Sequence, residues 1–236
     1  EGQIFYSDTN NDFKVVIGSD AWSASGSLIT ARGRLAGAGT QTAGLAFGGN
    51  NAPPTFNNTE EYDGVGWGTG GNLGTARGAL AGAGTQTAGL GFGGSPPDTG
   101  KTEEYNGTSW SEQNDLGTGR NALAGAGTQT AGLAFGGRPP DTGKTEEYNG
   151  TSWSEQNDMN TARRSLSGCG IQTAALAIAG GGGDPYPANV EQYDGTSWTE
   201  IADLNTARGS TAAAGTTSSA LVFGGEPPGT GTTATE

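Results

Sequence analysis

The sequence contains no histidine and a single cysteine, Cys169, among its 236 residues. One cysteine excludes an internal disulfide, and the lack of histidine excludes the usual zinc sites and the cysteine–histidine and serine–histidine nucleophiles. Carboxylates are the only plausible catalysts that remain. Because equivalent positions in the chain carry alanine (Ala38, Ala83 and Ala126), we expect Cys169 to be a small buried residue.

Positive charge is also scarce. Lysine and arginine number 11 against 24 aspartates and glutamates, which gives a formal net charge of −13. Binding of nucleic acid requires cations that neutralise phosphates, so we expect no nucleic-acid partner, and an anionic membrane surface is disfavoured as well. No apolar run approaches the roughly 20 residues needed to span a bilayer, and no signal peptide is visible, so we expect no membrane insertion.

Glycine, by contrast, is abundant, with 46 residues, and it belongs to an internal period. Five arginines are spaced by 45, 43, 43 and 45 residues, and five tryptophans keep the same spacings: Arg32, Arg77, Arg120, Arg163 and Arg208, with Trp22, Trp67, Trp110, Trp153 and Trp198. Such a period is typical of a repeat architecture. Glycine interrupts every candidate helix, at roughly 1 kcal/mol per position, so helical solenoids are excluded.

Four short runs make up one period. They cover residues 79–85, 87–94, 102–107 and 108–113, and are separated by a Thr-Gln-Thr corner, a Pro-Pro-Asp-Thr-Gly loop and an Asn-Gly-Thr turn. The Asn-Gly pair supplies the positive φ that a tight hairpin needs. We therefore predict an all-β fold in which each period is a four-stranded antiparallel propeller blade.

Side-chain size on the second run fits such a blade. Ala88, Leu90 and Phe92 point to one side, and Gly89 and Gly91 point to the other. The bulky face of one blade can therefore pack on the small face of the next. The first run holds almost only alanine and glycine, and we expect it at the crowded innermost position around a narrow axis.

The order of arginine, Gly-Gly, tyrosine and tryptophan in a period resembles the kelch repeat, a blade of kelch-type β-propellers. Besides the arginines and tryptophans, the matching residues are Gly48-Gly49, Gly93-Gly94, Gly136-Gly137 and Gly224-Gly225, with Tyr62, Tyr105, Tyr148 and Tyr193. The fourth period departs from the pattern at Ala179-Gly180, and the first has Ile17 in place of tyrosine. The resemblance implies the propeller fold.

The chain opens and ends within a period. Its first half-repeat includes Ile17 and Trp22, and its last runs from Arg208 to Gly225. If both halves shared one blade, an exposed sheet edge would be removed. We therefore predict a single domain, residues 1–236: a five-bladed β-propeller closed by its N- and C-terminal strands, with repeats that begin near residues 32, 77, 120, 163 and 208.

Residues 1–12 add a strand and a turn that have no counterpart in the other repeats. The runs at 2–7 and 13–18 predict a hairpin. Residues 1–22, EGQIFYSDTNNDFKVVIGSDAW, resemble a short motif of virion structural and tail proteins of bacteriophages, especially those of marine cyanobacteria, which also carry Thr-Ala-Gly-Leu-Ala-Phe-Gly-Gly repeats. This resemblance implies an extracellular protein of a phage virion.

The repeated polar and aromatic residues are expected to build the scaffold. Glutamate pairs recur (Glu60-Glu61, Glu103-Glu104 and Glu146-Glu147), but neighbours on a strand face opposite sides and cannot converge on one glycosidic bond. We predict that they pair with the repeated arginines and that the protein is not an enzyme. The arginines are interpreted as ties between loop carbonyls, and the tryptophans as packing between blades rather than sugar platforms.

Binding is expected where the periods differ, because recognition commonly lies on variable loops above a rigid scaffold. The loops between the second and third runs vary, whereas the corners at the opposite face stay nearly constant. We predict eight ligand-binding residues, with the two aromatic ones exposed: Phe56, Asp98, Lys101, Arg138, Asp141, Lys144, Asp184 and Tyr186. Ordinary loop variability explains the same pattern.

Asp and Asn in these loops could hold Ca²⁺, but the alternation of an EF-hand is missing, and no metal or cofactor is predicted.

The expected function is a non-enzymatic module of a phage virion or tail that recognises a host-surface glycan or receptor through this variable loop face. The alternative is a structural decoration or assembly module that binds other virion proteins, and a cellular kelch-type protein-interaction domain comes third. A polar, aromatic-bearing loop face open to solvent favours the first function, and an extensive apolar patch there favours the second.

Overall fold

The structure is a computed structural model that describes residues 3–7, 12–16, 25–51, 53–181 and 186–226, with side chains from residue 25 onward. Throughout these residues the regular elements are β-strands, and every strand pairing is antiparallel. The predicted all-β class is therefore confirmed. No helix that could cross a bilayer occurs in the described part of the chain.

Four complete sheets of four strands follow one another along the chain. Blade 1 consists of β3 (Ala36–Thr40), β4 (Ala43–Phe47), β5 (Thr59–Tyr62) and β6 (Trp67–Thr69). Blade 2 consists of β7 (Ala81–Thr85), β8 (Ala88–Phe92), β9 (Thr102–Tyr105) and β10 (Trp110–Gln113). The four strands predicted within one period are thus confirmed.

The later repeats continue this pattern. Blade 3 consists of β11 (Ala124–Thr128), β12 (Ala131–Phe135), β13 (Thr145–Tyr148) and β14 (Trp153–Gln156). Blade 4 consists of β15 (Ser167–Ile171), β16 (Ala174–Ile178), β17 (Val190–Tyr193) and β18 (Trp198–Glu200). A fifth, partial sheet holds only β19 (Ala212–Thr216) and β20 (Ser219–Phe223).

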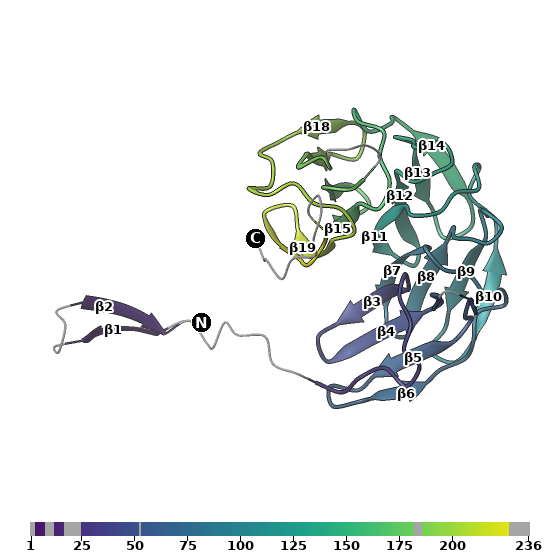
Figure 1. Ribbon diagram of the computed structural model, residues 1–236, viewed down its shortest axis with the longest axis horizontal. Coiled ribbons are helices and arrows are strands. Elements are labelled where there is room, and N and C mark those ends of the chain that lie inside the picture. The colour runs from purple at the N-terminus through teal and green to yellow at the C-terminus, as the bar shows by residue number, and fades with distance from the viewer. Residues whose placement is uncertain (1–2, 8–11, 17–24, 52, 182–185, 227–236) are drawn as a thin grey trace.

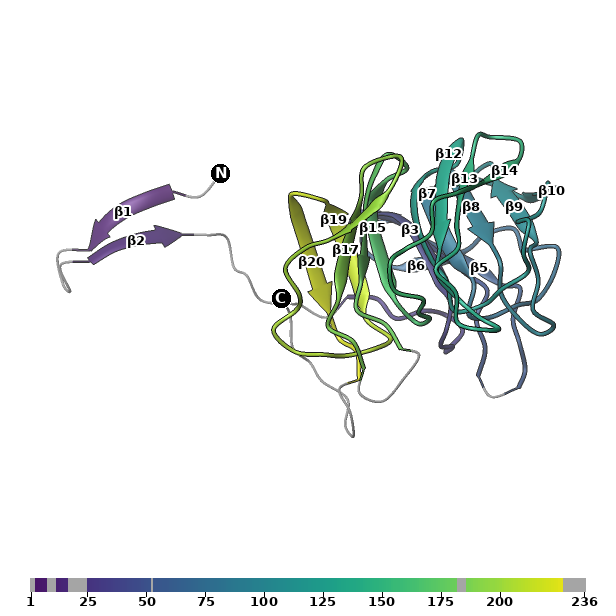
Figure 2. The ribbon, with the colours of Figure 1, turned by 90° about the horizontal axis from the view of Figure 1, so that it is seen from above.

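The sheets form a propeller ring. The first strand of each blade lies beside the first strand of the next, from β3 through β7, β11 and β15 to β19. In Figure 1 these strands surround a common axis and the sheets radiate outward from them. Seen from the side, the strands run between the two faces of the ring (Figure 2). The alanine- and glycine-rich strand is therefore innermost, as predicted.

Large side chains of one blade pack on glycines of the next. A Cβ on Gly132 would lie 2.7 Å from Leu90 Cδ2, and a Cβ on Gly125 would lie 2.6 Å from Phe92 Cζ. Leu45 and Phe47 meet blade 2 in the same way at Gly89 and Gly82. The predicted meeting of a bulky face with a small face is confirmed, and a side chain at these glycines would force the blades apart.

The ring has a seam between the partial sheet and blade 1. Among the described strands, the other neighbouring inner strands pack on each other, but β19 and β3 do not. Leu221 of β20 is 40% exposed, whereas its counterparts Leu90 and Leu133 are 0% exposed. Across the seam, a Cβ on Gly37 would meet no side chain within 4 Å, only the backbone of its own blade at Leu45.

The N-terminal hairpin is confirmed. β1 (Gln3–Ser7) pairs with β2 (Asp12–Val16), with Phe5 opposite Lys14, and this two-stranded sheet is separate from the blades. Figure 1 shows it outside the ring. The described strands thus give four complete blades and a partial fifth sheet.

Candidate functional site

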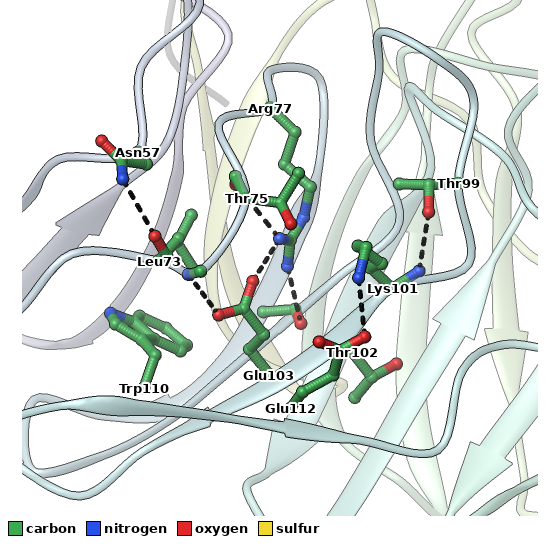
Figure 3. A network of polar contacts seen from close by, with 12 residues as sticks. Asn57, Leu73, Thr75, Arg77, Thr99, Lys101, Thr102, Glu103, Trp110 and Glu112 are labelled. Atoms are coloured by element: carbon green, nitrogen blue, oxygen red, sulfur yellow. Dashed lines mark hydrogen bonds and ion pairs between the residues drawn. The ribbon is translucent and has the colours of Figure 1, made fainter.

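The repeated arginine of each complete blade is a buried structural tie. Arg77 forms an ion pair with Glu103, and its Nε and Nη2 donate to the carbonyls of Gly93 and Gly91 at 2.9 and 3.5 Å. The other oxygen of Glu103 accepts the backbone N–H of Gly74 at 2.7 Å. Figure 3 shows Arg77 and Glu103 pointing toward each other. The same ion pair recurs in blades 1, 3 and 4 as Arg32–Glu60, Arg120–Glu146 and Arg163–Glu191. The predicted arginine–glutamate pairing is confirmed.

The Glu60 carboxylate is held in the charged form. Burial alone would raise the pKa of Glu60, but hydrogen bonds from Arg32 and from the backbone of Ile29 and Thr30 outweigh it and lower the pKa. A buried pair of this kind stabilises the fold only while both partners remain.

The second glutamate of each pair accepts a hydrogen bond from a tyrosine of the next blade. Tyr105 donates its hydroxyl to Glu61 at 2.5 Å, and Tyr148 donates to Glu104 at 3.0 Å. Adjacent glutamates therefore bind different partners on opposite sides of the strand, as their positions predict. Burial, followed by the hydrogen bond to Glu61, raises the pKa of Tyr105 to about 12. Burial and the neighbouring glutamate likewise raise the pKa of Tyr148.

Tyr105 is expected to ionise only well above the ordinary tyrosine pKa of about 10. Because the folded pKa is raised, the stabilisation is fully present below about pH 10 and is lost as the pH rises toward the folded value. A titration of phenolate absorbance, folded against urea-unfolded, measures the difference. Glu61→Gln should lower the pKa of Tyr105 and leave that of Tyr148 unchanged. One transition near pH 10 for every tyrosine of the folded protein would contradict this assignment.

The repeated tryptophans pack between blades. The Trp110 ring lies 4.7 Å from the Phe47 ring of the preceding blade, and its indole N–H donates to Thr59 Oγ1 at 2.9 Å. Trp153 and its neighbour Phe92 repeat the arrangement in the next blade. The prediction that the tryptophans pack between blades is confirmed. Cys169 is buried, also as predicted, and burial raises the pKa of its thiol.

A belt of backbone hydrogen bonds surrounds the ring axis. It runs through the residue two positions after each repeated arginine: Arg34, Ala79, Ala122, Ser165 and Ser210. From Ala79 onward, each N–H donates to the carbonyl of the equivalent residue in the preceding repeat, and the four distances are 2.8, 2.7, 2.8 and 2.9 Å in chain order. All five residues have φ between 51° and 56°, a strained region for residues other than glycine, and the belt holds them there.

The belt encloses a cavity of about 340 Å³ at the mouth of the axis. All five repeats line it: Arg34, Leu35, Ala79, Leu80, Asn121, Ala122, Leu123, Arg138, Ser165, Leu166, Ser210 and Thr211. Each blade crossing is bridged to the loop after the second strand, as at Asn121–Arg138 and Gly78–Ser95. The cavity therefore lies on the face that carries the variable loops, in the size range of small-ligand pockets.

Three of the predicted site residues take part in bonds beside this cavity. Arg138 lines it and donates from Nε to Asn121 Oδ1 at 3.3 Å, while Asn121 donates to the carboxylate of Asp98. Asp141 accepts from Arg164 at 2.7 and 2.9 Å. In the part of the chain with described side chains, no three acidic or cysteine residues gather as metal ligands.

The structure does not bring the other predicted residues to the cavity. Lys101 and Lys144 form ion pairs with outer-strand glutamates of their own blades, Glu112 and Glu155, at 2.6 and 2.9 Å. Both lysines lie away from the cavity because each is one residue before the third strand of its blade and is paired with a glutamate on the fourth strand. Asp184 lies outside the described residues.

The expectation of two exposed aromatic side chains is wrong, because Phe56 and Tyr186 are both half-buried. The backbone of Phe56 is bonded to Gly49 at 2.8 Å and to Arg77 at 3.2 Å, which draws this residue into the blade crossing. The ring of Tyr186 lies against Gly209 of the next repeat, where a Cβ would be 3.4 Å from Tyr186 Cδ1.

Sequence reasoning missed Arg34 and Asn121, which line the cavity, and Arg164, which binds Asp141. A signal for them exists in the sequence. The position one residue after each repeated arginine varies among glycine, asparagine and arginine, and the next position varies among arginine, alanine and serine. Equivalent positions of a ring meet at its axis. The loop pattern pointed to the correct face, but the equivalent crossing positions would have indicated its centre.

Two comparisons with known proteins find no similarity. The chain matches no protein-family model and no curated protein sequence.

Proposed function

We propose that the protein is a non-enzymatic binding module of a phage virion or tail, and that its loop face recognises a glycan or receptor on the host surface. The observation that carries this proposal is the axial cavity, which all five repeats line and in which the charged and amide side chains, Arg34, Asn121 and Arg138, are not repeated in the other blades. The phage setting rests on the resemblance of residues 1–22 to virion and tail motifs.

The scaffold supports a binding role over catalysis. Glu103 and Glu146 are tied to buried arginines, and Glu61 and Glu104 accept hydrogen bonds from tyrosines of the next blade. Carboxylates used in this way are not free to act as general acid and base on a substrate. The variable residues, in contrast, are presented on a rigid ring, which suits recognition.

We expect labelled protein to bind intact cells of candidate cyanobacterial hosts saturably, and surface polysaccharide to compete. Tyr186→Ala and Phe56→Ala should weaken this binding roughly tenfold or more, because aromatic anchors dominate interfaces. The matched control is Ile171→Thr, which places at the opposite face the residue found in the equivalent position of blade 3, Thr128. If all three variants lost binding to host cells equally, or if the folded protein did not bind these cells, the proposal would be contradicted.

We also propose that the ring closes with five blades, and that the N-terminal half-repeat shares the blade that β19 and β20 begin. Leu221 presents the bulky face, while Gly37 and Gly44 of blade 1 present the small face, so the two sides of the seam complement each other. Trp22 precedes Trp67 by 45 residues, the spacing of a full repeat. Pairing of an N-terminal strand with β20 would remove the exposed edge of the partial sheet.

The alternative function, an assembly module of the virion, is favoured by the same seam. A bulky face at one end of the blade series and a small face at the other can also join two copies head to tail, which builds open chains unless the rotation closes. Sedimentation distinguishes the two arrangements: a monomer at every concentration supports the closed ring, and concentration-dependent growth supports assembly.

A further inference from the structure

The charges that line the axial cavity are all of one sign. Arg34 and Arg138 contribute guanidinium groups, and no aspartate or glutamate belongs to the lining. This is unexpected in a chain whose formal net charge is −13. The nearby carboxylates have other partners, since Asp98 accepts from Asn121 and Asp141 accepts from Arg164.

Both cavity arginines keep donors available. Among the described residues, the side chain of Arg34 forms neither a hydrogen bond nor an ion pair, and the side chain of Arg138 bonds only to Asn121, through its Nε. Lys101 and Lys144 differ, because each is paired with a glutamate on the outer side of its blade. The planar fork of a guanidinium matches a carboxylate or a sulfate, and charge-assisted bonds of this kind are the strong ones.

The rest of the lining suits a small polar anion. Ser165, Ser210 and Thr211 supply hydroxyl groups, and the Asn121 side chain adds an amide. Leucines of four repeats line the same cavity, and both arginines are exposed to solvent there, so a dissolved anion can reach them. A volume of about 340 Å³ accommodates one sugar unit and not a folded partner.

We propose that the axial cavity binds the acidic group of an anionic sugar, a carboxylate or a sulfate, between Arg34 and Arg138. The proposal rests on the glycan-binding function above and names the ligand class. Ser165 and Ser210 orient the sugar hydroxyls from the opposite repeats of the belt. The variable loops around the cavity then contact the remainder of a longer chain.

Calorimetric titration of the whole chain with glucuronate, glucose 6-sulfate, glucose and inorganic sulfate tests this assignment. Both acidic sugars, or one of them, should bind, glucose should not, and added salt should weaken the binding. Arg34→Ser and Arg138→Ser should each weaken it roughly 10- to 100-fold. Both variants place serine where other repeats have it, at Ser165 and Ser95, so the fold accepts the residue. Lys144→Ser removes the same charge outside the cavity and should leave the affinity unchanged.

The outcomes separate this inference from the proposed function. Equal binding of glucose, equal affinity for inorganic sulfate, or an equal loss in Lys144→Ser would overturn the assignment of an anionic sugar. Binding to host cells without binding of either acidic sugar would overturn the inference and leave the proposed function in place. If the protein binds acidic sugars but does not bind host cells, the inference is supported and the proposed function is contradicted.

Discussion

Replacing Arg120 with methionine is expected to lower the free energy of unfolding by about 3–5 kcal/mol. Arg120 is 1% exposed and pairs with Glu146, which is 3% exposed. Methionine keeps the apolar stem but leaves a buried carboxylate whose only remaining bond is to the backbone N–H of Gly117 at 2.7 Å. Since domains of ordinary stability unfold with about 5–15 kcal/mol, urea denaturation should resolve the loss readily.

Two further variants identify the cause of this loss. Arg120→Met combined with Glu146→Leu removes both charges and should recover most of the stability, because an apolar pair of similar size often equals a buried ion pair. Lys144→Met breaks the exposed pair with Glu155 in the same blade and should lower the stability by less than about 1 kcal/mol. If Arg120→Met lowered the stability no more than Lys144→Met does, the buried pair would not be a structural tie.

The glutamate pair in blade 2 shows how far the sequence can be interpreted. The period places Glu103 and Arg77 in one repeat, and strand alternation separates Glu103 from Glu104, so both roles are predictable in outline. The partner of Glu104 is Tyr148 of the next blade, 44 residues away. That contact depends on the rotation between blades, which a spacing in sequence does not specify.

The axial cavity was less predictable for a related reason. Arg34 and its four counterparts meet only because the chain enters the inner strand through a turn with φ near 51°. Alanine and serine are not residues that signal this conformation, because it is typical of glycine and asparagine. The variable loops are visible in the sequence, but the exposure of Phe56 and Tyr186 depends on packing against the neighbouring crossing and repeat.

The second large effect concerns the leucine that packs between blades. Leu133→Ala is expected to lower the free energy of unfolding by about 2–5 kcal/mol, because Leu133 is 0% exposed and its loss leaves a cavity between blades 3 and 4. The equivalent leucine of the partial sheet, Leu221, is 40% exposed. Urea denaturation of Leu133→Ala and of Leu221→Ala therefore tests whether the seam is closed.

If the partial sheet packs on Gly44 of blade 1, Leu221→Ala should lower the free energy of unfolding by an amount within a factor of about two of the loss in Leu133→Ala. The apolar area that each leucine buries is then equivalent. In an open ring the same substitution should change the stability by less than about 0.5 kcal/mol, as for other surface positions. Gly44→Leu provides the complementary test. It fills the space that Leu221 would occupy, so it should destabilise a closed ring and leave an open one nearly unchanged. A small effect of both variants in a protein that sediments as a monomer would contradict closure.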